Sequence, residues 1–276
     1  MGSIIGIDVG ISTTKIVGIN ADGKVVAPMR IKATDPVTSL YGAFGKYLYD
    51  NHIRLVDVER VMLTGVGSDY IDKQVFARPT FKVEEFVANG LGARHESQLD
   101  RMVVVSMGTG TSLVQYENGD ISHIGGVGIG GGTLLGLSRV MLQTDEIPLV
   151  AELAQRGDIS KVNVLIGEIS ANSIPGLPSD ATASLFGNAK NDARREDLAL
   201  GILWLVLQSI GSCAYLSALG SGIKDFVLIG NLTLLPQCRD VFPAMEKLYG
   251  VRFHIPQHSE FCTAIGAALS QKGKGM

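Results

Sequence analysis

The sequence is poor in the residues that several classes of protein require. Its 276 residues include only three cysteines, Cys213, Cys238 and Cys262, and no two of them form a Cys-x-x-Cys pair. This scatter argues against a disulfide framework or a zinc site and fits a reducing cytosol. The net charge is −3 and no run of one sign occurs, so no basic patch for nucleic acid is expected. The apolar N-terminal stretch is interrupted by Asp8 and by glycines, so we expect no signal peptide and a cytoplasmic protein.

Long apolar runs are also scarce, with one exception. Residues 198–223 contain no charged side chain, and an apolar run of this length could span a membrane. Gln208 and several serines interrupt it, so we expect no membrane partner but the central helix of a soluble protein. The outer face of that helix could meet a second subunit. The candidate contacts for such a dimer are Trp204, Leu207 and Tyr215.

Two glycine-rich loops, about a hundred residues apart, carry most of the functional information. Residues 5–15 and 105–113 each run from an apolar strand through glycine and small hydroxyl residues into a second apolar strand. Glycine lets the backbone approach a ligand closely, and the N–H and hydroxyl groups of such a turn bind anions. Asp8 ends the first strand, where a carboxylate beside phosphates would serve Mg²⁺ through water or, alternatively, cap the turn. Two such loops in one chain predict that both bind one polyphosphate. The Walker A spacing Gly-x-x-x-x-Gly-Lys-Ser/Thr does not occur, which excludes a P-loop.

The order of predicted elements repeats along the chain. The first set is three strands, a helix and a strand, at residues 4–8, 14–20, 25–32, 37–52 and 60–64. The second set has strands at 102–107, 112–116 and 119–124, with Asn118-Gly119 as a hairpin turn. A glycine tract at 125–132 then leads into a helix at 133–142, whose N-terminus favours an anion. Further strands are expected at 225–229 and 251–255. The repetition predicts an α/β protein with an internal structural duplication.

Five further segments occur in a fixed order along the chain: residues 108–113, 125–132, 155–158 (Gln-Arg-Gly-Asp), 174–176 (Ile-Pro-Gly) and 263–267 (Thr-Ala-Ile-Gly-Ala). In this order, and with the first loop, they resemble the type II pantothenate kinase family, within the superfamily of actin, hexokinase and the heat-shock chaperones. The resemblance implies an α/β fold of two lobes with duplicated ribonuclease H-like topology, the actin/hexokinase-like ATPase fold, around an inter-lobe cleft. The expected lobes are residues 1–98 and 99–276, with the last helix packing back on the first lobe.

The same resemblance implies a kinase that transfers the γ-phosphate of MgATP to the primary alcohol of pantothenate, the first step of coenzyme A synthesis. It also implies a homodimer and regulation by acyl-CoA. Within Lys82-Val83-Glu84-Glu85, the position of the catalytic base falls on Glu85. An alcohol has a high pKa, so a carboxylate must accept its proton during phosphoryl transfer. Glu84 is the alternative base, since only helix register separates the two. Both could also simply occupy a first helical turn, where acids are favoured.

The remaining site residues follow from the resemblance. Those expected to bind ATP or its phosphates are Asp8, Gly10, Ser12, Thr13, Thr14, Lys15, Gly108, Thr109, Gly110, Thr111, Gly130, Gly131, Gly132, Gly230 and Asn231. Those expected to bind the acceptor are Ser112, His123, Gly126 and Asp180. Lys15 could instead be a solvated lysine of an edge strand. The Gly230-Asn231 pair could be a plain strand-to-helix turn.

Departures from the family pattern fall on the acceptor side. His123 occupies a position where the family usually has an arginine, and residues 177–187 contain an insertion. Neutral histidine cannot make the bidentate contact of arginine with a carboxylate, and His123 could be a strand-end residue facing solvent.

Three other functions stay open. A sugar kinase of the same superfamily would need an Asn-Asp base segment, and Asn191-Asp192 lies in a polar loop without a strand. An ATP-driven activator of 2-hydroxyacyl-CoA dehydratases would need cysteine thiolates on an iron–sulfur cluster. A non-catalytic ATP-binding regulator would also be compatible with the replaced arginine.

Overall fold

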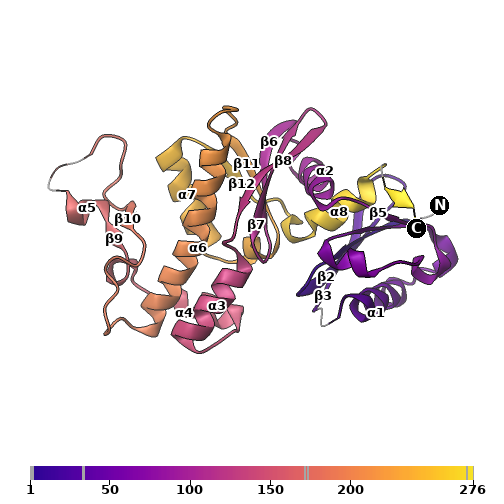
Figure 1. The fold of residues 1–276 in the computed structure, drawn as a ribbon, viewed down its shortest axis with the longest axis horizontal. Coiled ribbons are helices and arrows are strands. Elements are labelled where there is room, and N and C mark those ends of the chain that lie inside the picture. Colours follow the sequence, from indigo (N-terminus) through magenta and orange to yellow (C-terminus); the bar gives the residue numbers. More distant parts are fainter. Residues whose placement is uncertain (1–2, 33–34, 171, 173, 272, 276) are drawn as a thin grey trace. The chain divides into compact units, whose positions relative to one another are not determined.

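The computed structural model describes residues 3–32, 35–170, 172, 174–271 and 273–275. The chain divides into two compact units, which are described separately (Figure 1). The first unit contains residues Met1–Val104, Val114–His123 and Ile255–Met276, and the second contains Val105–Leu113 and Ile124–His254. The boundary expected at residue 98 stays a prediction.

The first unit is built on a six-stranded sheet in the order β13-β5-β4-β1-β2-β3. Its strands are β1 (Ser3–Val9), β2 (Thr13–Ile19), β3 (Val25–Lys32), β4 (Val58–Thr64), β5 (Thr80–Lys82) and β13 (Lys274–Gly275). The strands β1, β2 and β3 pair antiparallel, and β4 pairs parallel with β1. The predicted opening of three antiparallel strands, a helix and a parallel strand is therefore confirmed.

Side chains along each strand point alternately to the two faces of this sheet, and different helices cover each face. On one face Ile5, Ile7 and Val9 are buried in a core shared with α1 (Pro36–Asp50), which begins where the side chain of Asp35 caps the N–H of Thr38. On the other face α8 (Cys262–Leu269) packs on β1 and β2, and α2 (Glu85–Ser97) packs on α8. Asp8 and Lys15 belong to this second face.

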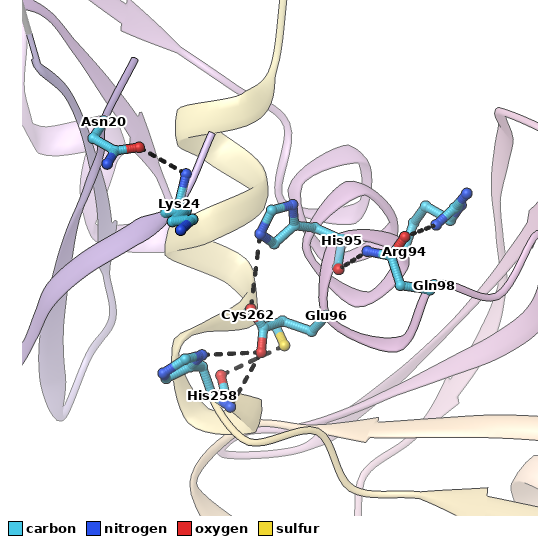
Figure 2. A network of polar contacts seen from close by, with 8 residues as sticks. All are labelled: Asn20, Lys24, Arg94, His95, Glu96, Gln98, His258 and Cys262. Carbon is cyan, nitrogen blue, oxygen red and sulfur yellow. Dashed lines mark hydrogen bonds and ion pairs between the residues drawn. The ribbon is translucent and has the colours of Figure 1, made fainter. Parts of the chain in front are cut away.

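The helices α2 and α8 cross so closely that their backbones are in contact. A Cβ atom at Gly92 would overlap the carbonyl of Cys262, and one at Gly266 would overlap the carbonyl of Ala88. At the end of α2, Glu96 accepts hydrogen bonds from the backbone N–H of His258, at 3.3 Å, and pairs with the ring Nδ1 of the same residue, at 3.0 Å (Figure 2). These contacts fix the position of α2, and therefore of its first residue, Glu85.

A second sheet has five strands in the order β12-β11-β6-β7-β8. The strands are β6 (Arg101–Met107), β7 (Thr111–Glu117), β8 (Asp120–Val127), β11 (Asp225–Ile229) and β12 (Arg252–His254). Residues 101–104, 114–117 and 120–123 of these strands group with the first unit. The predicted hairpin at Asn118-Gly119 is confirmed, because both residues have positive φ, 51° and 99°.

Helices make up most of the rest of the second unit. They are α3 (Gly131–Leu142), α4 (Ile147–Ala154), α5 (Ile166–Ile169), α6 (Arg195–Ala218) and α7 (Cys238–Tyr249). A two-stranded sheet joins β9 (Val164–Leu165) to β10 (Thr182–Ser184). Short 3₁₀ turns occur at Leu55–Asp57, Val66–Tyr70, Val75–Ala77, Ile159–Lys161, Asn231–Leu234 and Ser259–Phe261.

The long apolar stretch forms α6, which contacts α3, α4 and α7. By length and composition α6 could cross a membrane, but half of its most apolar 18-residue window is buried inside the protein. A central core helix passes the same test. The expectation that Leu207 faces a second subunit is wrong, because Leu207 is fully buried. Trp204 and Tyr215 are half-buried, and Tyr215 stacks on Tyr249.

Candidate functional site

Asp8 and Lys15 face each other on neighbouring strands of the first unit. They are register partners in the β1–β2 pair, and the Lys15 Nζ lies 3.8 Å from the Asp8 Oδ2. The side chains are only 7% and 14% exposed, for Lys15 and Asp8 respectively. The alternative that Lys15 is a solvated edge-strand lysine is wrong, because β2 lies between β1 and β3.

The Asp8 carboxylate lies directly against the end of β4. A Cβ atom at Gly65 would lie 2.5 Å from the Asp8 Oδ1 and 2.8 Å from the Val9 carbonyl, and Gly65 has φ 84°. Glycine is therefore required at this position by both space and backbone conformation. Burial raises the pKa of Asp8, and the Lys15 ammonium partly offsets that rise.

Glu85 adds a second carboxylate to this pair. It is the first residue of α2 and is half-buried. The pKa of Glu85 is raised, mainly by burial and also by the charge of Asp8, while the charge of Lys15 lowers it. Asp8, Lys15 and Glu85 thus form one electrostatically coupled group, which we call the charged cluster.

Glu84, the alternative base, differs in its surroundings. It is exposed at the N-cap of α2, and its side chain makes no capping hydrogen bond. The burial of Glu85 and its coupling to Asp8 and Lys15 therefore favour Glu85 over Glu84 for proton transfer.

An open pocket of about 800 Å³ in the first unit lies beside the charged cluster. Its lining includes Glu85 and also Gly65, which touches the Asp8 carboxylate. The charged side chains in the lining are Asp69, Lys82, Glu84 and Glu85.

His123 lies next to the start of α2. Its ring stacks on Phe86 with centroids 4.1 Å apart and an angle of 8° between the planes. His123 is exposed, but it lies within β8 and not at the end of a strand, and its ring is held against the residue that follows Glu85. The histidine that departs from the family pattern is thus near the candidate base.

The first glycine-rich loop is a tight turn. The N–H of Gly10 donates to the Thr13 carbonyl at 3.0 Å, which leaves Ile11 and Ser12 exposed at the tip. The side chain of Thr14 is fully buried, so a contact of Thr14 with phosphate would have to use its backbone and stays a prediction. Side chains alternate along β2, so Thr14 lies on the α1 face, opposite to Lys15.

In the second unit the second loop is braced by the glycine tract. At the start of α3, the N–H of Gly131 donates to the Gly108 carbonyl and the N–H of Gly132 donates to the Thr109 carbonyl, each at 2.8 Å. The Thr111 hydroxyl donates to the Ile129 carbonyl at 2.8 Å. Because these two N–H groups are engaged within the protein, they hold the loop in place. A contact of Gly131 and Gly132 with phosphate stays a prediction.

Close backbone approach explains further glycines of this unit. A Cβ atom at Gly130 would lie 2.6 Å from the Thr109 carbonyl, and one at Gly126 would lie 2.7 Å from the Thr111 carbonyl. Gly230 has φ 97°, and a Cβ there would lie 2.5 Å from the Met107 carbonyl. The structure therefore brings together the second loop, the glycine tract and the Gly230-Asn231 turn. Asp180 is exposed in the segment that precedes β10.

Sequence reasoning missed part of the surroundings of Glu85. Asn89 and Thr263 are buried and joined by a hydrogen bond of 2.8 Å. The signal available in the sequence was the spacing of four residues between Glu85 and Asn89, which places both on one face of a helix.

Comparison with known proteins gives the family. The profile of the Fumble family matches residues 52–270. The chain is 33% identical over 196 residues to pantothenate kinase 2 of Oryza sativa subsp. japonica, covering 66% of this chain and 22% of that protein. It is 27% identical over 218 residues to type II pantothenate kinase of Staphylococcus haemolyticus, covering 76% of this chain and 82% of that one. The chain therefore spans about a fifth of the plant relative and most of the bacterial one.

A solved structure shows the fold. The activator of the 2-hydroxyisocaproyl-CoA dehydratase from Clostridium difficile with bound ADPNP superposes with a TM-score of 0.67 and 17% identity, covering 97% of this chain and 93% of that one. This likeness confirms the actin/hexokinase-like α/β ATPase fold that the family resemblance implies. With the family profile matching most of the sequence, the chain belongs to the Fumble family, the type II pantothenate kinases.

Proposed function

We propose that this protein transfers the γ-phosphoryl group of ATP to the primary hydroxyl of pantothenate, giving 4′-phosphopantothenate in the first step of coenzyme A synthesis. The observation that supports this most directly is the position of Glu85, half-buried at the start of α2 and coupled to Asp8 and Lys15. Membership of the Fumble family supports the choice of acceptor.

In this proposal Glu85 is the general base. Its carboxylate takes the hydroxyl proton of pantothenate while the hydroxyl oxygen attacks the γ-phosphorus, and ADP leaves with the electrons of the broken P–O bond. A raised pKa suits this role, because a base is most effective when its pKa lies near the working pH.

Asp8 would hold Mg²⁺ through water, and Lys15 would face the phosphates. Within the described part of the chain no group of three metal-ligating side chains occurs. A single carboxylate fits a magnesium ion whose other ligands are phosphate oxygens and water. The ion would supply positive charge beside the phosphates, while Lys15 lowers the pKa of Asp8 against the effect of burial.

The nucleotide contacts are assigned to both glycine-rich loops. Gly10, Ser12 and Thr13 in the first loop, and Gly108, Thr109, Gly110 and Thr111 in the second, would bind phosphate oxygens. Gly130, Gly131 and Gly132 would brace the second loop and direct the N-terminus of α3 toward it. Gly230 and Asn231 would lie on the adenosine side.

The acceptor contacts are assigned to Ser112, Gly126, Asp180 and His123. Ser112 follows Thr111 in the second loop and would lie near the hydroxyl that is phosphorylated. The stack of His123 on Phe86, one residue after Glu85, supports a position of His123 on the acceptor side.

Assembly and control are part of the same proposal. We expect a cytoplasmic homodimer with a contact through the half-buried Trp204 and Tyr215 of α6, and regulation by acyl-CoA. Size-exclusion chromatography with light scattering tests the dimer, and a 29 kDa monomer would contradict it.

The cysteines do not favour the activator function. Cys238 and Cys262 are buried, and burial raises the pKa of the Cys238 thiol to about 12 and that of Cys262 as well. Cluster ligation requires thiolates, which burial of this kind disfavours.

The decisive experiment measures ADP release with pantothenate, pantetheine and a panel of sugars. Pantothenate should stimulate release, Glu85→Gln should abolish the stimulation, and ATP binding measured by calorimetry should persist. Glu84→Gln is the matched control, since Glu84 is exposed and adjacent, and it should remain active. Stimulation by a sugar alone, or full activity of Glu85→Gln, would refute the proposal.

A further inference from the structure

A buried amide lies one helical turn beyond Glu85. Asn89 follows Glu85 by four residues on α2, and its side chain is fully buried. Its Oδ1 accepts a hydrogen bond of 2.8 Å from the hydroxyl of Thr263 on α8. Thr263 is itself 6% exposed, so this pair lies inside the contact between the two helices.

The other end of the Asn89 amide is unsatisfied. Within the described part of the chain, the Asn89 Nδ2 has no hydrogen-bond partner although it is buried. A buried NH₂ group without a partner is costly, and such a group in a folded protein calls for an explanation, of which a functional partner that takes the bond is one. The bond from Thr263 to Oδ1 fixes which end of the amide carries this free donor.

Helix geometry places the free donor toward the candidate base. Side chains four residues apart share one face of a helix, and they lean toward the helix N-terminus. The Asn89 side chain therefore covers the turn that begins with Glu85. Backbone contact of Gly92 with Cys262, and of Gly266 with Ala88, prevents α2 and α8 from sliding relative to each other.

We propose that Asn89, oriented by Thr263, is a positioning residue whose Nδ2 donates a hydrogen bond to the ionised Glu85 carboxylate and holds it in the orientation that accepts the hydroxyl proton. This inference rests on the proposed role of Glu85 as base. Asn89 itself touches no substrate in the proposal. Its bond to Glu85 forms as the carboxylate turns to receive the proton.

Other charged groups around Glu85 affect the same carboxylate. Asp8 of β1 and Lys15 of β2 couple to it electrostatically, and Asp69, Lys82 and Glu84 line the same pocket. A hydrogen bond to the charged form lowers the pKa of a carboxyl group, so Asn89 acts in the same direction as Lys15 and against Asp8.

The test removes the Thr263 hydroxyl without changing the size of the side chain. Thr263→Val should lower kcat about tenfold, leave KM for ATP unchanged and move the acid limb of the pH–kcat/KM profile to higher pH. Thr263→Ser keeps the hydroxyl and should behave like the wild type, and Asn89→Leu should resemble Thr263→Val. A kcat for Thr263→Val within twofold of wild type, or an equal loss in Thr263→Ser, would overturn the proposal.

A measurement without substrate separates this proposal from the proposed function. The carboxyl ¹³C resonance of Glu85, assigned by its loss in Glu85→Gln, can be titrated in folded protein. Its midpoint should rise in Thr263→Val and stay unchanged in Thr263→Ser. Wild-type protein that turns over no acceptor would refute the kinase alone, whereas a midpoint that is the same in both variants would refute the role of Asn89.

Discussion

At the scale of single residues, burial gives Lys15 a structural and a chemical role at once. Its ammonium lies 3.8 Å from the Asp8 carboxylate and also acts electrostatically on Glu85, and burial raises the pKa of both carboxyl groups. A buried ammonium without a counter-ion would be costly, and so would two buried carboxylates without a cation. Lys15 therefore stabilises the ionised forms that both carboxyl groups need for their proposed roles.

Replacing Lys15 by methionine should shift the acid limb of the pH–rate profile. Lys15 lowers the pKa of Glu85, so its removal should raise that pKa. Because the base is active only when ionised, activity should then be lost at a higher pH on acidification. We expect the acid limb of kcat/KM to move to higher pH, together with a loss of rate. Profiles from pH 5 to 9 would measure the shift. Lys15→Arg, which keeps the charge, should leave the limb near its wild-type position, and an unmoved limb in Lys15→Met would contradict the coupling.

His123 offers a test of the acceptor side. Arginine gives a carboxylate two parallel hydrogen bonds that histidine cannot. If the acceptor carboxylate lies here, His123→Arg should lower KM for pantothenate about tenfold and leave KM for ATP unchanged, since one added bond to a charged group is worth roughly 1.5 kcal/mol. Phe86→Leu removes the ring on which His123 stacks and should raise KM for pantothenate. Steady-state kinetics with each substrate varied would show either effect, and equal changes in both KM values would place His123 elsewhere.

At the scale of elements, the contact between α2 and α8 determines where the base lies. Gly92 and Gly266 let the two helices approach until backbone touches backbone. Glu96 then fastens the end of α2 to His258 (Figure 2). The position of Glu85 at the other end of α2 is therefore set by packing that involves no substrate.

Gly92→Ala should separate these helices and destabilise the protein. The added methyl would overlap the Cys262 backbone, which cannot move aside as a flexible side chain would, so we expect a loss of about 3 kcal/mol in the free energy of unfolding. Gly45→Ala is the matched control, because Gly45 is also helical and a Cβ there meets nothing within 4 Å. That variant should gain up to about 1 kcal/mol from helix propensity. Urea unfolding would measure both, and equal stability of the two variants would contradict the tight crossing.

The elements that could be predicted are those with strong local signals. The strand at residues 225–229 was predicted with the bounds that β11 has, because an apolar run ends there at glycine. The strand predicted to end at 124 continues to Val127, since glycines of the tract extend β8. The alternation of side chains along β2 would have predicted that Thr14 is buried, whereas the resemblance to a phosphate-binding loop placed it among the phosphate-binding residues. The contact of α2 with α8 had no sequence signal, because small residues such as Gly92 reveal close packing only in three dimensions.

At the scale of the whole molecule, the candidate phosphate-binding residues are distributed over both compact units. The first unit holds Asp8 and Lys15, and the second holds the loop that begins at Gly108. Each group is assembled within its own unit by contacts that require no ligand. Folding therefore meets the cost of ordering each loop within its own unit, and nucleotide binding should add stability to residues that are already in place in each unit.

Nucleotide should raise the unfolding temperature in a way that depends on Asp8. A ligand at a hundred times its Kd that binds only folded protein adds about 2.7 kcal/mol, which for a chain of this size shifts Tm by roughly 5 to 10 °C. With ADPNP, we expect part of the shift to require Mg²⁺, and Asp8→Asn should remove that part and keep the rest. Asp22→Asn is the control, because Asp22 is exposed in the turn between β2 and β3. Calorimetry with and without EDTA separates the two parts, and an Mg²⁺-dependent shift that persists in Asp8→Asn would assign the ion to other residues. Because this readout needs no phosphoryl acceptor, it tests the donor side of the reaction independently of whether pantothenate is the substrate.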